Sequence, residues 1–292
     1  MKPAPFRYHA PESLDEALEL LAEHGEEAKV LAGGQSLVPT LNFRLARPAV
    51  LVDLNRIAAL AYVEAESDGG LRVGAMTRQR AVERSPLVME RAPLVAETMP
   101  FVAHPQIRNR GTFGGSLAHA DPAAELPAVA LALDAELVLR VSGGERRLRA
   151  RDFFVGLFAT ALAPGELLVE VRLPQLPTGA GCAFVEMARR HGDYALVGVA
   201  ACVELGEDER VRAARVALLS VGEGPVEAHQ ACRTLIGERP VEEALVAAAD
   251  EAATTDVDPP SDIHATSAYR RHLTRLLVRR ALHTAAARAR AG

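Results

Sequence analysis

Alternating apolar and polar positions near the start of the chain predict a small parallel unit. Ser13 and Glu16 form an S-x-x-E capping box, in which each side chain accepts a hydrogen bond from a backbone N–H of the other residue, so a helix begins here. A period near 3.6 predicts a second helix with Leu37, Leu41 and Leu45 on one face. The expected order is strand 28–32, helix 37–45 and strand 50–53. This order with short links implies a right-handed parallel crossover.

Beyond this unit the pattern becomes typical of antiparallel strands. Ser-Asp-Gly-Gly at 67–70 and Ser-Gly-Gly-Glu at 142–145 each separate two apolar runs, and both are hairpin signals. The expected strands are 62–66, 71–75, 136–141, 146–150 and 166–173, with helices at 77–84 and 93–101. The fold class predicted for this part is therefore α+β, with a parallel unit joined to a mainly antiparallel one.

A segment rich in proline and glycine, residues 174–181, divides the chain because such a composition disfavours regular structure. We expect one domain at 1–177, with a parallel part at 1–57 and a mainly antiparallel part at 58–177, and a second domain at 178–292. The second domain should hold an antiparallel meander of three strands followed by helices. Its strands are predicted at 182–190, 195–205 and 211–221, and its helices at 241–253 and 267–288.

Composition and charge exclude several classes of protein. A chain of 292 residues that is 49% apolar and 24% charged is typical of globular proteins and can bury two cores. Its net charge of -5 and pI near 6.0 argue against a nucleic-acid partner. The longest nearly apolar run, residues 126–133, is too short to span a bilayer, and no cationic leader precedes an apolar stretch. A cytoplasmic location is expected.

Motifs for metal, nicotinamide or hydrolytic chemistry are missing. Cys182, Cys202 and Cys232 are too far apart for a CxxC cluster, and their odd number argues against a disulfide framework. We therefore expect buried, inert thiols and no iron–sulfur centre in this chain. The histidines have no second ligand at metal spacing. Neither G-x-G-x-x-G nor G-x-S-x-G occurs, so a Rossmann site and a serine hydrolase are unsupported, and we expect no catalytic and no metal-binding residue.

Two glycine pairs are the strongest candidates for cofactor binding. The segments Gly33–Ser36 and Gly111–Ser116 each hold adjacent glycines with hydroxyl side chains, and each is followed by a helix signal. Adjacent glycines let the main chain adopt positive φ and approach an anion, so that N–H groups form a nest. The only lysines are Lys2 and Lys29, which removes a Walker-type site. We predict that both segments contact the diphosphate of one dinucleotide cofactor.

A carboxylate follows the second glycine pair. Asp121 is a plausible helix N-cap, Pro122 fits the first helical position, and Glu125 then lies in the first turn. Glu125 could accept hydrogen bonds from sugar-type hydroxyls. Alternatively, the Glu125 carboxylate only stabilises the helix by lying near the positive end of the helix dipole.

Four stretches together resemble a known family. They are AGGQS at 32–36, IRNRGTFGGSLAHADPAAELP at 107–127, RHGDYALVGVAA at 190–201 and SDIHATSAYRRHL at 261–273. They are similar to the FAD-binding medium subunit of the molybdenum hydroxylases, the xanthine dehydrogenase and carbon monoxide dehydrogenase family, and most similar to the aerobic carbon monoxide dehydrogenase type. The resemblance implies a two-part FAD-binding domain of the vanillyl-alcohol-oxidase type, followed by a C-terminal domain with a three-stranded sheet and a helical bundle.

The resemblance also implies a set of cofactor-binding residues. The two glycine segments would hold the FAD diphosphate, Glu125 would contact cofactor hydroxyls, and Tyr194 would approach the flavin ring, although Tyr194 also fits an ordinary turn. Gln35 replaces a histidine that many relatives carry. The full set is Ala32, Gly33, Gly34, Gln35, Ser36, Leu37, Ile107, Gly111, Thr112, Gly114, Gly115, Ser116, Glu125, Leu168 and Tyr194.

The function implied by the resemblance is electron transfer within a larger complex. The partners would be a large subunit with molybdopterin and a small subunit with two [2Fe-2S] clusters, assembled as a dimer of heterotrimers. The complex would be cytoplasmic, with peripheral attachment to the inner membrane face as the alternative. FAD here would pass electrons to an external acceptor. Two alternatives are a stand-alone FAD-dependent oxidoreductase of the same superfamily and a non-enzymatic nucleotide-binding or assembly protein.

Overall fold

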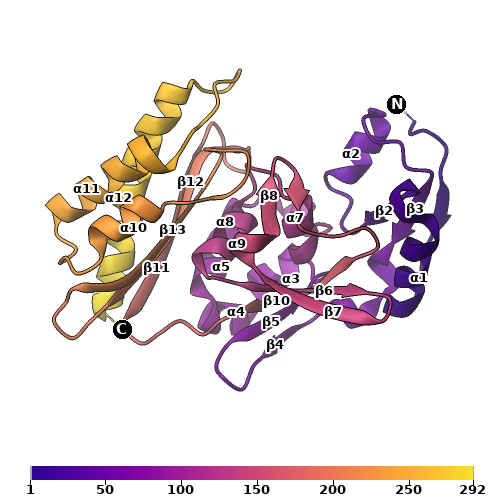
Figure 1. The fold of residues 1–292 in the computed structure, drawn as a ribbon, viewed down its shortest axis with the longest axis horizontal. Helices are drawn as coiled ribbons and strands as arrows, with labels where there is room; N and C mark the ends of the chain where they lie inside the picture. The colour runs from indigo at the N-terminus through magenta and orange to yellow at the C-terminus, as the bar shows by residue number, and fades with distance from the viewer. Residues whose placement is uncertain (1, 292) are drawn as a thin grey trace.

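The computed structural model describes residues 2–291, and its first sheet is small and parallel (Figure 1). In it β3 (Val50–Asp53) lies between β1 (Arg7–His9) and β2 (Ala28–Leu31), and both pairs run parallel. Helix α1 (Leu14–His24) packs its apolar face on β3, and α2 (Leu37–Asn42) connects β2 to β3. The predicted parallel unit is confirmed, and β1 adds a strand that the sequence pattern did not indicate.

Two local details in this unit differ from the sequence prediction. Ser13 accepts from the Glu16 N–H at 3.2 Å as predicted, but the Glu16 carboxylate accepts from the Glu12 N–H at 3.0 Å rather than from Ser13. Helix α2 ends three residues earlier than the predicted 37–45, because Arg44 adopts a left-handed φ of 58°. Leu45 is consequently 82% exposed instead of lying on the buried face.

The second sheet is antiparallel and forms the centre of the molecule. Its strands are β4 (Val63–Ala65), β5 (Leu71–Gly74), β6 (Glu136–Val141), β7 (Gly144–Arg149) and β10 (Leu167–Leu173). They pair in the order β4-β5-β10-β6-β7, so both predicted hairpins and the 166–173 strand are confirmed. A small β8 (Phe154–Gly156) and β9 (Ala159–Thr160) pair beside it.

Seven short helices accompany this sheet. They are α3 (Gln79–Arg84), α4 (Pro86–Arg91), α5 (Pro93–Thr98), α6 (Pro105–Arg108), α7 (Phe113–His119), α8 (Glu125–Ala132) and α9 (Ala150–Phe153). Except for α6, these helices share one apolar core with β5, β6 and β10. All residues of α8 are buried because this helix lies between the central sheet and the C-terminal sheet (Figure 1).

The C-terminal sheet is an antiparallel meander of β11 (Ala180–Ala188), β12 (Ala195–Leu205), β13 (Val211–Leu219) and β14 (Val226–Glu227). Its outer face is covered by helices, namely α10 (His229–Leu235), α11 (Glu242–Glu251) and α12 (Ser267–Ala291) (Figure 1). The α+β class is confirmed. The expected three strands are corrected to four, since β14 is only two residues long and leaves no periodic signal.

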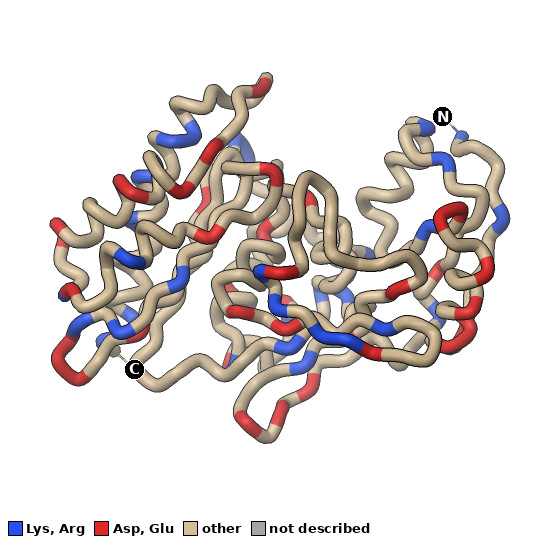
Figure 2. The backbone as a smooth tube through the Cα atoms, in the orientation of Figure 1, with Lys and Arg blue, Asp and Glu red and all other residues tan. Residues whose placement is uncertain are grey.

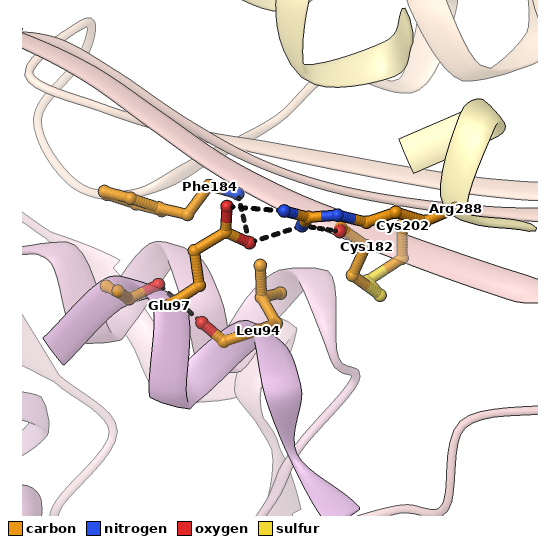
Figure 3. Close-up of a disulfide and its surroundings, with 7 residues drawn as sticks. Leu94, Glu97, Cys182, Phe184, Cys202 and Arg288 are labelled. Carbon is orange, nitrogen blue, oxygen red and sulfur yellow. Dashed lines mark hydrogen bonds and ion pairs between the residues drawn. A yellow bond between two sulfur atoms is a disulfide. The ribbon is translucent and has the colours of Figure 1, made fainter. Parts of the chain in front are cut away.

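A disulfide lies where the C-terminal sheet meets α5. The register of β11 and β12 places Cys182 opposite Cys202, and their sulfurs are bonded (Figure 3). The expectation of three free thiols was therefore wrong, because a hairpin brings residues that are distant in sequence face to face. Arg288 of α12 pairs with Glu97 of α5 at 2.6 Å and donates to the Cys182 carbonyl. Only Cys232 stays free among the described cysteines, and burial raises its pKa to about 11.

Positions of basic and acidic residues alternate along most of the backbone (Figure 2). Within residues 2–291, no helix is at once long enough and apolar enough to cross a membrane. The same residues contain no group of three or more histidine, cysteine, aspartate or glutamate side chains that could hold a metal ion.

Candidate functional site

The first glycine segment, Gly33–Ser36, turns the chain from β2 into α2. Gly34 has a φ of 73°, which glycine adopts without steric cost. The Gly34 carbonyl accepts from Val38 N–H at 3.0 Å, and the Gln35 side-chain amide donates to the Gly33 carbonyl at 3.0 Å. Within the part of the chain that the structure describes, the N–H groups of residues 33–36 have no protein acceptor. Free amides at a tight turn suit an anion such as a diphosphate.

The second segment, Gly111–Ser116, leads into α7 and is built differently. Thr112 caps the helix by accepting from the Gly115 N–H at 3.1 Å, and the Gly114 N–H donates to the Ala75 carbonyl at 2.9 Å. Neither glycine has a positive φ. The expected N–H nest at this pair is therefore absent, because these amides are used inside the protein. Glycine is required at 114 for a packing reason, since a Cβ there would lie 2.5 Å from the Ala75 Cβ.

The two glycine segments contact each other directly. A Cβ on Gly33 would lie 2.4 Å from the Arg110 carbonyl oxygen and 2.7 Å from the Gly111 Cα. A Cβ on Gly115 would lie 3.2 Å from the Ala32 Cβ. The fold thus places the two segments side by side, as expected if they share one ligand.

A hydrogen-bonded clamp that the sequence did not reveal joins these segments. Arg78 donates to the Arg110 carbonyl and, at 2.6 Å, to the Asn55 side chain. Asn55 in turn donates to the Ala32 carbonyl at 2.9 Å. Burial, and then the neighbouring Arg110, lower the pKa of Arg78. The only feature of the sequence that could have indicated this clamp is Asn55, a polar residue just after the carboxyl end of β3. Folds with parallel strands place ligand-binding groups at that end.

A cavity of about 450 Å³ opens at this junction. The predicted site residues that line it are Ala32, Gly33, Gly34, Gln35 and Ile107. The lining residues that sequence reasoning missed are Leu31, Val38, Pro39, Asp53, Asn55 and Arg110. The cavity therefore combines the free amides of the first segment with polar groups from the end of β3.

The other predicted residues lie outside the lining of this cavity. Ser36 and Leu37 start α2, and the side chain of Ser36 is exposed. Leu168 is only 5% exposed on β10 and belongs to the central core. In the second segment, Gly111 lies against Gly33 and Gly115 against Ala32, but none of the predicted residues Gly111, Thr112, Gly114, Gly115 and Ser116 lines the cavity.

Two carboxyl groups lie within electrostatic reach of each other where the central region packs on the C-terminal sheet. Glu125 is 8% exposed, and burial together with the charge of Asp121 raises its pKa to about 7. Burial, and then the charge of Glu125, raise the pKa of Glu186 on β11 to about 8. The Glu186 Oε2 is buried without a hydrogen-bond partner among the described residues. Tyr194 lies within electrostatic reach of Glu125 and is 69% exposed, so its ring is free to contact a ligand.

The helix that carries Glu125 begins later than predicted. Asp121 was expected to be its N-cap, but the Asp121 side chain accepts from the Ala123 N–H at 2.9 Å and its carbonyl from the Ala124 N–H at 3.0 Å. These bonds form a separate turn. Helix α8 starts at Glu125 without a side-chain cap, so Glu125 is in the first turn as predicted.

Stability of the FAD-free chain is expected to decrease as pH rises from about 4.5 to about 8. Both folded-state pKa values, about 7 for Glu125 and about 8 for Glu186, lie above the ordinary 4.5. The folded chain therefore binds these protons more tightly than the unfolded chain. The stabilisation is complete below the unfolded value and is lost as pH passes the folded values.

A Glu186→Gln variant tests this, because it keeps the shape of the side chain and removes its charge. Its Tm at pH 8 is expected to exceed that of the wild type by several degrees, since 1 kcal/mol corresponds to roughly 2–4 °C in chains of similar size. The two proteins should converge at pH 5. Glu207→Gln, on an exposed turn, is the control. Equal Tm differences at both pH values would contradict the expectation.

Comparison with known proteins gives one consistent result. The model of the FAD binding domain in molybdopterin dehydrogenase matches residues 4–176, and that of the CO dehydrogenase flavoprotein C-terminal domain matches residues 182–285. The 6-hydroxypseudooxynicotine dehydrogenase complex subunit alpha of Paenarthrobacter nicotinovorans is 45% identical over 99% of this chain and 97% of its own length.

Solved structures agree with the sequence relatives. A chain of carbon monoxide dehydrogenase from Hydrogenophaga pseudoflava superposes with a TM-score of 0.95 at 39% identity, covering 99% of both chains. Quinoline 2-oxidoreductase from Pseudomonas putida 86 gives a TM-score of 0.93 at 40% identity, again over 99% of both chains. The similarity thus spans the parallel, central and C-terminal sheets alike.

Proposed function

Because this chain belongs to the FAD-binding medium subunits of the molybdenum hydroxylases, we propose that it is the electron-transfer subunit of such a complex. The observation that carries the proposal is the contact between Gly33 and Gly111, beside a cavity lined by free amides. These amides can meet the negative charge of the FAD diphosphate where no lysine lines the cavity. The residues therefore fit the cofactor that the family implies.

The proposed roles follow from where each residue lies. Gly33–Ser36 would bind the diphosphate through main-chain N–H groups, while Gly111–Ser116 would support that segment from behind. Asn55 and Arg78 would hold the two together. Glu125 and Tyr194 would contact the part of FAD that lies between the domains, which we place at 1–177 and 178–292. The remaining proposed contacts are Ala32, Leu37, Ile107 and Leu168.

The partners proposed are a large molybdopterin subunit and a small subunit with two [2Fe-2S] clusters, assembled as a dimer of heterotrimers. When bound, FAD would supply the redox chemistry that links the partner's clusters to an external acceptor. This chain would hold FAD in position, shield it from solvent and leave it accessible to the acceptor. A stand-alone oxidoreductase would need a further domain that binds its own substrate, whereas the two family models already account for residues 4–176 and 182–285, which favours the electron-transfer subunit.

The absorbance spectrum and metal content of the purified protein test the proposal. We expect about one FAD per chain, together with iron and molybdenum in co-purified subunits. Flavin without iron or molybdenum under conditions that preserve complexes would favour a stand-alone flavoenzyme. A preparation without flavin would favour a non-enzymatic nucleotide-binding or assembly protein and would refute the proposed function.

A further inference from the structure

A buried hydrogen-bonded network joins the start of β12 to the turn that precedes α8. Its centre is Ser220, which directly follows β13 and is 7% exposed. The Ser220 N–H donates to the Pro122 carbonyl at 2.8 Å, and the Ser220 hydroxyl donates to the Ala195 carbonyl at 2.7 Å. Pro122 belongs to the turn before Glu125, and Ala195 directly follows Tyr194 in the chain. Ser220 therefore links the two segments that carry Glu125 and Tyr194.

Arg270 of α12 holds Ser220 from the other side. Arg270 is 5% exposed, and its guanidinium donates to the Leu196 carbonyl at 2.5 Å and to the Ser220 carbonyl at 3.1 Å. The same guanidinium pairs with Asp262 at 2.8 Å. One planar group thus fixes the second residue of β12 relative to the residue that follows β13. Arg270 and Asp262 come from the stretch at 261–273, which supplies none of the proposed FAD contacts.

The backbone of Ser220 is in a conformation that serine rarely adopts. Its φ is 62°, in the left-handed region that favours glycine. All three of its polar groups, the N–H, the hydroxyl and the carbonyl, are bonded, each to a different segment of the chain. A glycine here would relieve the backbone but would lose the hydroxyl bond to Ala195. Strained residues of this kind persist where their surroundings fix them, and they cluster at functional sites.

We propose that Ser220 and Arg270 are positioning residues, which fix the spacing between Tyr194 and Glu125 around bound FAD. The inference rests on the proposed function, in which both of these side chains contact the cofactor. Tyr194 is 69% exposed, so its position depends on the backbone that follows it rather than on packing of its ring. Glu125 depends on the turn before it, because α8 starts without a side-chain cap. Loss of either Ser220 bond would let the tyrosine ring and the carboxylate move relative to each other.

A pair of glycine variants in the purified complex tests the proposal. Ser220→Gly suits the left-handed φ and removes only the hydroxyl bond, so its Tm should stay near that of the wild type. Its FAD affinity, measured by rebinding FAD to flavin-depleted protein, should fall about 2- to 10-fold, the equivalent of one hydrogen bond. Glu209→Gly makes the same kind of change at a φ of 61° on the exposed β12–β13 turn, and it should keep wild-type affinity. Wild-type affinity in Ser220→Gly would overturn the positioning role.

Fluorescence of the bound flavin separates positioning from a general loss of stability. Aromatic rings pack in offset stacks, and a tyrosine ring stacked on a flavin quenches its fluorescence. Tyr194→Ala gives the reference for a flavin without that ring, and unchanged fluorescence in this variant would overturn the inference. Ser220→Gly should move the fluorescence part of the way to the reference and should change it no further when combined with Tyr194→Ala. Additive effects would show that Ser220 acts independently of Tyr194, which would also overturn the inference.

Two neighbouring arginines provide a second, matched arm. Arg271 donates to the Ala253 and Val257 carbonyls at 2.9 and 2.7 Å. It also pairs with Asp258 at 3.1 Å, so its contacts match those of Arg270 in kind. Arg270→Lys and Arg271→Lys both keep the charge and lose the planar fork, and both should lower Tm. Only Arg270→Lys should weaken FAD binding and quenching.

The outcomes distinguish this inference from the proposed function on which it rests. Equal FAD affinity and quenching in Arg270→Lys and Arg271→Lys would overturn the role of Arg270. With flavin present in the wild-type complex, that result leaves the proposed function standing. A wild-type complex without flavin would overturn the proposed function and this inference with it.

Discussion

A Gly33→Ala variant is expected to purify with less than about one tenth of the wild-type FAD, which corresponds to a loss of roughly 1.4 kcal/mol or more in cofactor binding. The added Cβ would lie 2.4 Å from the Arg110 carbonyl oxygen and 2.7 Å from the Gly111 Cα. Both are backbone atoms that cannot rotate away. The segments must therefore separate, which displaces the free amides and also costs about 1–3 kcal/mol of stability.

Gly156→Ala is the matched control for this variant. Gly156 has no positive φ, and no atom outside its neighbours lies within 4 Å of the position of an added Cβ. It should keep wild-type FAD content and a Tm near that of the wild type. The measurement is the ratio of flavin absorbance to protein, with Tm recorded for each preparation. Full flavin content in Gly33→Ala would show that contact between the two segments is not needed for binding.

An Arg108→Met variant is expected to lose about 3–5 kcal/mol of stability, because it leaves a partly buried carboxylate and two carbonyls without their main donor. Arg108 is 4% exposed and pairs with both Glu83 oxygens, at 2.9 and 3.1 Å. It also donates to the Val102 and Ala103 carbonyls at 2.8 and 3.0 Å. At roughly 2–4 °C per kcal/mol, its Tm should fall by on the order of 10 °C.

Arg80→Met is the control for this variant, because Arg80 donates to the same Glu83 carboxylate, at 2.7 Å, from a more exposed position. Its loss should cost about 1 kcal/mol or less. Since Arg108 lies just before Gly111, the Arg108→Met variant should also retain less FAD. The measurements are the Tm of thermal unfolding and the flavin content of the Arg108→Met and Arg80→Met variants. Similar Tm values for the two variants would contradict the buried-pair argument.

Much of the fold could be predicted because its signals are local. The Ser13 cap, the two glycine-containing hairpins and the long strands of the C-terminal meander each depend on a few neighbouring residues. Short elements such as β14 and α10 were missed because two to seven residues form no measurable period. The capping role assigned to Asp121 was wrong because an aspartate serves a turn as well as a helix start.

Long-range contacts could not be predicted in the same way. The link between Cys182 and Cys202 depends on the register of two strands, which one sequence does not specify. The clamp of Arg78 and Asn55 depends on three segments meeting in space. Glu186 carried only the weak signal of a polar residue in an apolar strand, and its proximity to Glu125 became visible only when α8 packed against the C-terminal sheet.

The sequence by itself determined that two glycine segments, with hydroxyl side chains and no Walker-type lysine, are suited to a dinucleotide, because small residues and hydroxyl groups are properties of the local chain. Only the tertiary structure decided which of the two segments has amides free to bind a ligand and which one packs against the other. The first segment keeps its amides free, whereas the second uses its amides in hydrogen bonds to Ala75 and Thr112 and packs against the first. The physical reason is that a backbone N–H binds either a ligand or the protein, and that choice depends on which segments the fold brings into contact.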